Sequence, residues 1–140
     1  MSIPSSPSNA PVLSESAGNA VSVTVPADVS YVSTLRLTTA SLAARCGLTI
    51  DDIEDLRLAV DEACALLLPH ATAGSNLEIH FVLAQGEIVV DATVHSADDA
   101  EPDRTGFAWT VLGALANRVD VQRDSELLTI TVTKYSEASQ

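Results

Sequence analysis

Hydrophobic and polar residues alternate in several short stretches of the chain, and these stretches predict strands. Residues 20–26 alternate valine with serine and threonine and end at a proline, which is the two-residue period of a half-buried strand. Two further runs, 77–84 and 87–94, are rich in β-branched residues and are joined through Gln85-Gly86. This arrangement predicts a β-hairpin.

Two segments between the first strand and this hairpin have hydrophobic residues at helical spacing. In residues 28–46, Asp28 is placed to cap the N-terminus, and Gly47 follows the last turn. In the second segment, Thr49 precedes Asp52 by three residues, as in a capping box, and we expect this helix to reach about His70. The apolar stripes are Val32, Leu35, Leu42 and Cys46 in the first helix, and Ile53, Leu56, Val60, Ala63 and Leu67 in the second.

The C-terminal part of the chain predicts one more helix and its closing strands. Residues 95–105 are acidic and poor in apolar residues, which is typical of a loop. Helical spacing returns over 106–119, where we expect Phe107 and Trp109 to anchor the core, with an exposed interface as the alternative. The run 121–134 predicts a closing strand, or a hairpin that turns at Asp124-Ser125.

The predicted order of elements is β-α-α-β-β-α-β-β. Because strands that follow one another usually pair, this order favours an α+β fold: a two-layer sandwich with a mostly antiparallel sheet and helices on one face. We expect this domain to span residues 20–135. Residues 1–19 are rich in Ser, Pro and Asn and are expected to form a flexible arm, and 136–140 a C-terminal tail.

The balance of charges narrows the class of partners. The 140 residues contain 7 Lys and Arg against 19 Asp and Glu, so the net charge is −12. Nucleic acid is not expected as a partner, because phosphate binding requires a basic face, and a protein partner is favoured instead. The sequence shows neither a signal peptide nor an apolar stretch long enough to span a membrane. We therefore expect a cytoplasmic protein that does not bind membranes.

Cysteines and histidines do not predict a metal site. Cys46 and Cys64 are expected to be small core residues rather than a disulfide, because the chain shows no export signal. Combined with His70, His80 and His95, they match none of the usual zinc-ligand spacings. We therefore expect no bound metal at these residues.

Glu62 and His70 lie eight residues apart in the second predicted helix, with Leu66 halfway between them. Positions i, i+4 and i+8 lie along one face of a helix, and this face is not the one that carries the apolar stripe. From spacing alone two interpretations stay open. The face is a functional site, or Glu62 is a solvated charge and His70 a residue favoured at the helix end by the dipole.

The segment DLRLAVDEACALLLPHA, residues 55–71, resembles the first nucleotide-site helix of bacterial anti-sigma factors of the serine-kinase type, which are GHKL (Bergerat-fold, histidine-kinase-like) ATPases. Residues 22–38 resemble the opening strand and first helix of that family, and residues 106–121 resemble its last helix. The resemblance implies a sheet covered by helices on one face. It also implies a protein that holds an alternative sigma factor inactive until a STAS-type anti-anti-sigma protein displaces it.

Active members of this family use ATP and magnesium to phosphorylate a serine of the STAS protein. A helix carboxylate acts as general base, an asparagine one turn later ligates the metal, and glycines let a lid approach the phosphates. Glu62 matches the carboxylate and His70 the histidine that closes the motif, but Leu66 stands at the asparagine position. In the second glycine box, Gly106 is kept and Ala108 replaces the next glycine.

The adenine-site motif Asp-x-Gly-x-Gly is also missing, with Asp91, Asp98 and Asp99 as candidates for its aspartate. Because three sites depart in the same direction, we predict a binding protein built on a kinase fold, in which the catalytic role of Glu62 is lost and no cofactor is needed. ATP with magnesium remains the alternative cofactor. The alternative functions are an active serine kinase that acts on the STAS partner, and a decoy that binds only that partner.

Arg36 lies beside the apolar stripe of the first predicted helix. In the family, an arginine at this place contacts both the sigma factor and its antagonist, so the resemblance implies that Arg36 binds partners. The alternative is a surface arginine paired with an acidic residue. The resemblance also implies a homodimer formed through the sheet edge and first helix, where the first strand is available as an edge.

Overall fold

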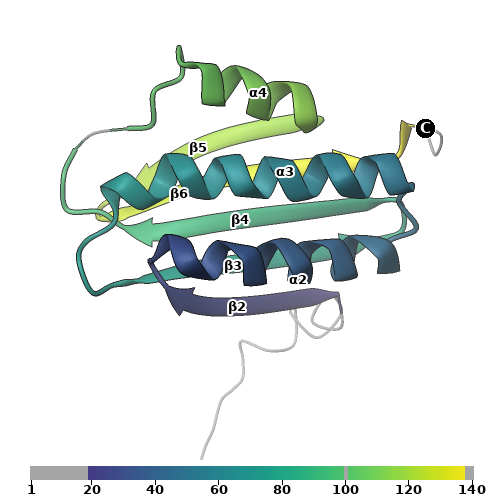
Figure 1. Ribbon diagram of the computed structural model, residues 1–140, viewed down its shortest axis with the longest axis horizontal. Helices are drawn as coiled ribbons and strands as arrows, with labels where there is room; N and C mark the ends of the chain where they lie inside the picture. Colours follow the sequence, from purple (N-terminus) through teal and green to yellow (C-terminus); the bar gives the residue numbers. More distant parts are fainter. Residues whose placement is uncertain (1–18, 100, 138–140) are drawn as a thin grey trace, which may run out of the picture.

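The structure, a computed structural model, describes residues 19–99 and 101–137. Five antiparallel strands form one sheet in the order β2-β3-β4-β6-β5, and three α-helices cover one face of it (Figure 1). This confirms the predicted α+β sandwich and its order of elements. The elements are β2 Ala20–Pro26, α2 Val32–Arg45, α3 Ile50–Leu67, β3 Asn76–Ala84, β4 Glu87–His95, α4 Phe107–Leu115, β5 Arg118–Asp124 and β6 Leu127–Tyr135, with 3-10 turns at Val29–Tyr31 and Leu68–His70.

Side-chain alternation separates the two faces of the sheet. In β4, the side chains of Ile88, Val90, Ala92 and Val94 are buried beneath the helices, and the residues between them are half-buried. On the other face, Asp91 lies opposite His80 of β3 and Thr131 of β6. No described helix or strand packs over that polar face, which we call the open sheet face (Figure 1).

Local hydrogen bonds explain where the first two helices begin. Thr49 caps α3 by accepting a hydrogen bond from the backbone N–H of Asp52 at 3.1 Å, as predicted. Asp28 also acts as a cap, but it accepts from the N–H of Ser30 and caps a short 3-10 turn. The helix α2 therefore begins only at Val32.

The helix predicted over 106–119 is too long. It ends at Leu115 because Ala116 adopts an extended conformation, and the N–H of Asn117 donates to the carbonyl of Thr133 at 2.9 Å. From Arg118 onward the chain is an edge strand paired with β6, so the hairpin alternative for the C-terminal run is confirmed. Its turn lies at Ser125-Glu126, one residue later than predicted.

The core lies between the sheet and the three helices. Cys46 and Cys64 are buried free thiols, as predicted, and burial raises the pKa of Cys64 to about 12, with a smaller contribution from the nearby charge of Asp61. Trp109 packs against the core from a half-buried position. Phe107 does not, because it begins α4 on the solvent side and is 83% exposed; its prediction as a core anchor is wrong.

Within the described residues, no helix is long and apolar enough to cross a membrane. The predicted N-terminal arm lies outside the described residues except for Asn19, as do residues 138–140 of the predicted tail. The boundaries proposed for the arm and tail stay predictions.

Candidate functional site

The helix α3 lies between α2 and α4, so it has one flank toward each of them (Figure 1). Asp61 is on the α2 flank, where its carboxylate accepts a hydrogen bond from Nε of Arg36 at 3.0 Å. Asp55 is on the α4 flank, where its carboxylate lies 3.5 Å from Nζ of Lys134. The same Nζ donates to the carbonyl of Leu115 at the end of α4, at 3.0 Å.

Glu62 and Leu66 belong to the α4 flank. They follow Asp55 by seven and eleven residues, close to two and three helical turns, and therefore lie on the same side of α3. Both are half-buried, and Leu66 packs against the hydrophobic core. The carboxylate of Glu62 has no hydrogen-bond or ion-pair partner among the residues that the structure describes. The flank thus presents one carboxylate next to an apolar side chain.

A polar cluster lies at the C-terminal end of this flank, and we call it the Asp98 cluster. Nδ1 of His70 is 3.7 Å from Oδ1 of Asp98, and that carboxylate accepts a hydrogen bond from Oγ of Ser96 at 3.1 Å. Arg123 of β5 donates to the carbonyl and the hydroxyl of Ser96 at 3.1 and 3.2 Å, and its NH2 lies 3.7 Å from Asp98. The cluster fixes the start of the loop after β4 to the end of α3.

The structure separates the three candidate aspartates. Asp98 approaches His70, as described above. Asp91 lies on the open sheet face, where it accepts a hydrogen bond from the hydroxyl of Thr131 at 2.6 Å. Asp99 is exposed in the loop. Of the three, the geometry therefore favours Asp98 as the residue that belongs with Glu62 and His70.

Gly106 is the N-cap residue of α4, and its backbone is extended, with a φ of −82° that any residue adopts. Space rather than conformation favours glycine here, because a Cβ atom would lie 2.9 Å from Oδ2 of Asp103. Asp103 in turn accepts hydrogen bonds from the backbone N–H and the hydroxyl of Thr105, at 2.9 and 2.7 Å, which lower the pKa of Asp103. Ala108 is half-buried in the first turn of α4.

Sequence analysis missed two basic residues that organise this region, Lys134 and Arg123. Each occupies an inward position of its strand, in phase with buried or half-buried apolar residues such as Val132 and Val121. A cation at an inward position requires partners, since an unpaired buried charge is strongly unfavourable. In both strands a basic residue stands where the alternation of apolar and polar residues predicts an apolar one. This departure from the alternation was the signal that could have identified Lys134 and Arg123 from the sequence.

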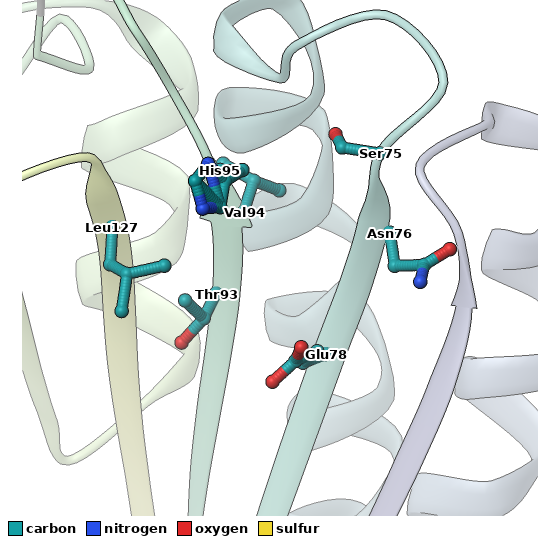
Figure 2. A pocket seen from close by; sticks show the side chains of 7 residues that line it. All are labelled: Ser75, Asn76, Glu78, Thr93, Val94, His95 and Leu127. Atoms are coloured by element: carbon teal, nitrogen blue, oxygen red, sulfur yellow. The ribbon is translucent and has the colours of Figure 1, made fainter.

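A separate cavity of about 240 Å³ opens on the open sheet face, between the start of β3, the end of β4 and the start of β6 (Figure 2). Its lining includes Glu78, Thr93 and His95. Since Glu62 lies on the helical side of the sheet, this cavity is not part of the predicted site. No group of three or more His, Cys, Asp or Glu residues in the described part of the chain is arranged to hold a metal ion.

Comparison with known proteins identifies the family to which this chain belongs. The family model described as histidine kinase-like ATPase domain matches residues 25–134, and the chain therefore belongs to this family. Within it, the chain is similar to proteins named serine-protein kinase RsbW. It is 31% identical to that of Halalkalibacterium halodurans over 82% of each chain, and 31% identical to that of Bacillus velezensis, over 82% of this chain and 84% of the relative.

The fold has a solved counterpart in the crystal structure of the RsbU and RsbW domains of Rv1364c from Mycobacterium tuberculosis. The TM-score is 0.66 at 17% identity, over 83% of this chain. The match spans 32% of the solved chain. At this identity the likeness supports the fold, which agrees with the helix-covered antiparallel sheet.

Proposed function

We propose that this protein is a cytoplasmic anti-sigma factor and partner-switching regulator. In this proposal it binds an alternative sigma factor and a STAS-type anti-anti-sigma protein, and phosphorylates neither. The relatives named serine-protein kinase RsbW support the class of regulator. The observation that carries the absence of phosphoryl transfer is Leu66, which packs against the core at the family's metal-binding position.

The donors near Glu62 do not fit a magnesium–nucleotide site. Leucine offers no oxygen to a hard cation, which is bound in proteins through carboxylate, carbonyl and water oxygens. Asp98 is already held by Ser96, Arg123 and His70. The acidic loop that follows adds negative charge where a triphosphate would need compensation.

The surface of α2 supports the binding part of the proposal. The segment 29–45 contains two arginines and no acidic residue, in a chain whose net charge is −12. Leu37, next to Arg36, is 70% exposed. The carboxylate of Asp61 accepts a hydrogen bond from Nε of Arg36. The two terminal nitrogens of this guanidinium have no hydrogen-bond partner among the described residues. They form a fork suited to a partner's carboxylate, with an apolar anchor beside it.

The proposal includes a homodimer, for which the outer edge of β2, unpaired among the described strands, is the candidate interface. β2 is an edge strand with the half-buried valines Val21, Val23 and Val25 on its helical side. An edge strand offers free N–H and C=O groups to a second chain. Light scattering during gel filtration measures the mass: twice that of the chain is expected, and a monomer at all concentrations contradicts the dimer.

The binding function is tested with the sigma factors and STAS proteins encoded in the same genome. Each is purified and titrated into the full chain by calorimetry without nucleotide. We expect at least one sigma factor to bind, and a STAS protein to displace it in a competition titration. Absence of binding across the whole set contradicts the proposal.

The second candidate function is an active serine kinase, which the retained carboxylate of Glu62 favours. It predicts transfer of radiolabelled phosphate from ATP to a serine of the STAS partner, with loss of labelling in Glu62→Gln. We expect no labelling above that of Glu62→Gln. Labelling that depends on Glu62 overturns the non-enzymatic proposal.

A further inference from the structure

The helix α4 is unusual for a helix at the surface because it contains no charged residue. Its half-buried or buried side includes Trp109, Leu112 and Leu115, which belong to the core or pack against it. Surface helices normally carry charged and polar side chains on the opposite side. Here the exposed positions are Phe107, Thr110, Gly113 and Ala114, which we call the α4 face.

Phe107 dominates the α4 face. Its 83% exposure leaves a large aromatic side chain in water, where the ring gains nothing from the core. Burying such a side chain against a partner is strongly favourable, and aromatic residues are frequent hot spots of protein interfaces. An exposed phenylalanine on an uncharged helix face is therefore a candidate anchor for another protein.

The turn before α4 holds this anchor in place. Asp103 receives the two hydrogen bonds from Thr105, and the N–H of Gly106 donates to its carbonyl at 3.4 Å. Arg104 lies over the ring of Trp109, 5.6 Å from its centroid, and 3.5 Å from the carboxylate of Glu101. A preorganised anchor loses less conformational entropy on binding than a mobile one.

The charges of the loop that precedes Phe107 indicate the chemistry of the partner. Asp99, Glu101 and Asp103 are exposed in the loop that leads into α4. The cation in this segment, Arg104, is engaged by Glu101 and Trp109. The loop that leads into the α4 face therefore carries more exposed acids than free cations, and complementary potential favours a basic partner.

We propose that the α4 face is a docking site for a basic amphipathic segment of a partner protein. Apolar side chains of the segment cover Phe107, and its lysines or arginines pair with Asp99 and Glu101. The inference rests on the proposed function in one respect, that this chain acts by binding proteins. It adds a second interface, distinct in chemistry from the acid-free α2 surface around Arg36.

The test uses the full chain and two synthetic helical peptides that differ in charge alone. One contains leucine and lysine at amphipathic spacing, and the other contains glutamate at every lysine. Fluorescence anisotropy of the labelled peptides measures binding at low and physiological salt. We expect the lysine peptide to bind and the glutamate peptide not to bind. Phe107→Ala is expected to weaken the lysine peptide by about tenfold or more.

Matched variants separate docking from general attraction to an acidic protein. Leu37→Ala removes an exposed apolar residue of α2. The double variant Glu78→Gln with Asp120→Asn removes two acids from the open sheet face. Each of these two control variants is expected to bind the lysine peptide as tightly as the wild type does. Asp99→Asn with Glu101→Gln is expected to weaken it several-fold and reduce its salt dependence. Circular dichroism verifies that each variant is folded.

Two results overturn the inference: Phe107→Ala binds the lysine peptide as tightly as the wild type, or Leu37→Ala loses as much affinity as Phe107→Ala does. Arg36→Ala separates this failure from failure of the proposed function. Arg36→Ala is expected to leave the affinity for the lysine peptide unchanged and to lower the affinity for the sigma factor or the STAS protein. If Arg36-dependent partner binding persists when Phe107 has no effect, the regulator stands and the α4 docking site is wrong.

Discussion

Asp61 and Glu62 are neighbouring acids on one helix, yet they face different surroundings. Asp61 points to the α2 flank and binds Arg36, whereas Glu62 points to the α4 flank and has no ionic partner within the described residues. On the first flank a carboxylate fixes the arginine that we assign to partner binding. On the second flank, Glu62 lies near Leu66, a half-buried side chain that packs against the core.

Under the proposed function, this difference would let a histidine kinase-like scaffold lose phosphoryl transfer and keep its partners. The two flanks share the backbone of α3, but no described side-chain hydrogen bond or ion pair joins Arg36 and Asp61 to Glu62 or Leu66. We therefore expect changes on the α4 flank to leave the α2 flank intact, because the two sets of side chains share no polar partner. The following predictions test this independence of the two flanks.

The largest expected effect is that of Leu66→Asn, which restores the family's amide at the metal position. It replaces a half-buried apolar side chain that packs against the core with a polar amide, so we expect the free energy of unfolding to fall by about 2 kcal/mol. Leu58→Asn is the matched control: it lies on the same helix and is 43% exposed, and it should cost less than ~1 kcal/mol. Urea denaturation measures both. A melting temperature of Leu66→Asn that rises with ATP and magnesium would show an open nucleotide site instead.

Arg36→Ala is expected to lower the affinity for the sigma factor or the STAS partner by about tenfold, since truncating an interface arginine removes a charge-assisted contact. The fold should remain, because a partly exposed ion pair with Asp61 contributes at most ~1 kcal/mol. Arg118→Ala, an exposed arginine at the start of β5, serves as the control with unchanged affinity. Calorimetric titration that finds Arg36→Ala equal to Arg118→Ala returns Arg36 to an ordinary surface ion pair.

A smaller effect distinguishes the two neighbouring acids directly. Asp61→Asn releases Arg36 from its charged partner, and we expect partner affinity to fall by about threefold through loss of orientation. Glu62→Gln should leave affinity within error, because it lies on the other flank. Equal effects of the two substitutions in the same titration would show that the flanks are coupled.

The smallest effect concerns Cys64, which lies one turn after Asp61. Its thiol has a pKa of about 12, caused mainly by burial and to a smaller extent by Asp61. The thiolate is the reactive form, so alkylation by iodoacetamide at pH 8 should be very slow in the folded protein. Asp61→Asn lowers this pKa slightly and should leave the slow rate almost unchanged. Fast labelling in the variant, followed by mass spectrometry, would mean that Asp61 rather than burial protects the thiol.

The sequence was sufficient for the elements that carry a clear period. The stripe of α3 and the cap at Thr49 predicted that helix to within a few residues, and the alternation of β2 and β4 predicted strands with one buried face. The end of α4 was mispredicted because Ala116 and Val119 continue the apolar spacing of Leu112 and Leu115. The helix ends where the backbone N–H of Asn117 donates to the carbonyl of Thr133. Local helix propensity does not encode such a tertiary hydrogen bond.

The candidate site was predictable only in part. Helical geometry placed Glu62 and Leu66 on one side of α3, but it could not say which helix that side faces. The choice of Asp98 among three aspartates depended on the 3.7 Å approach of its carboxylate to His70, a contact between residues that are distant in the sequence. The exposure of Phe107 likewise follows from the position of the turn at Asp103 to Gly106, which fixes where α4 begins.

The central claim, binding without nucleotide chemistry, is tested most directly by one titration. The sigma factor that binds this chain is titrated by calorimetry in the absence and in the presence of ATP and magnesium at cellular concentrations. We predict the same dissociation constant in both, because under the proposed function Leu66 and the engaged Asp98 do not bind the metal–nucleotide pair. A dissociation constant that changes by about tenfold on addition of ATP and magnesium, and returns when magnesium is chelated, contradicts the claim.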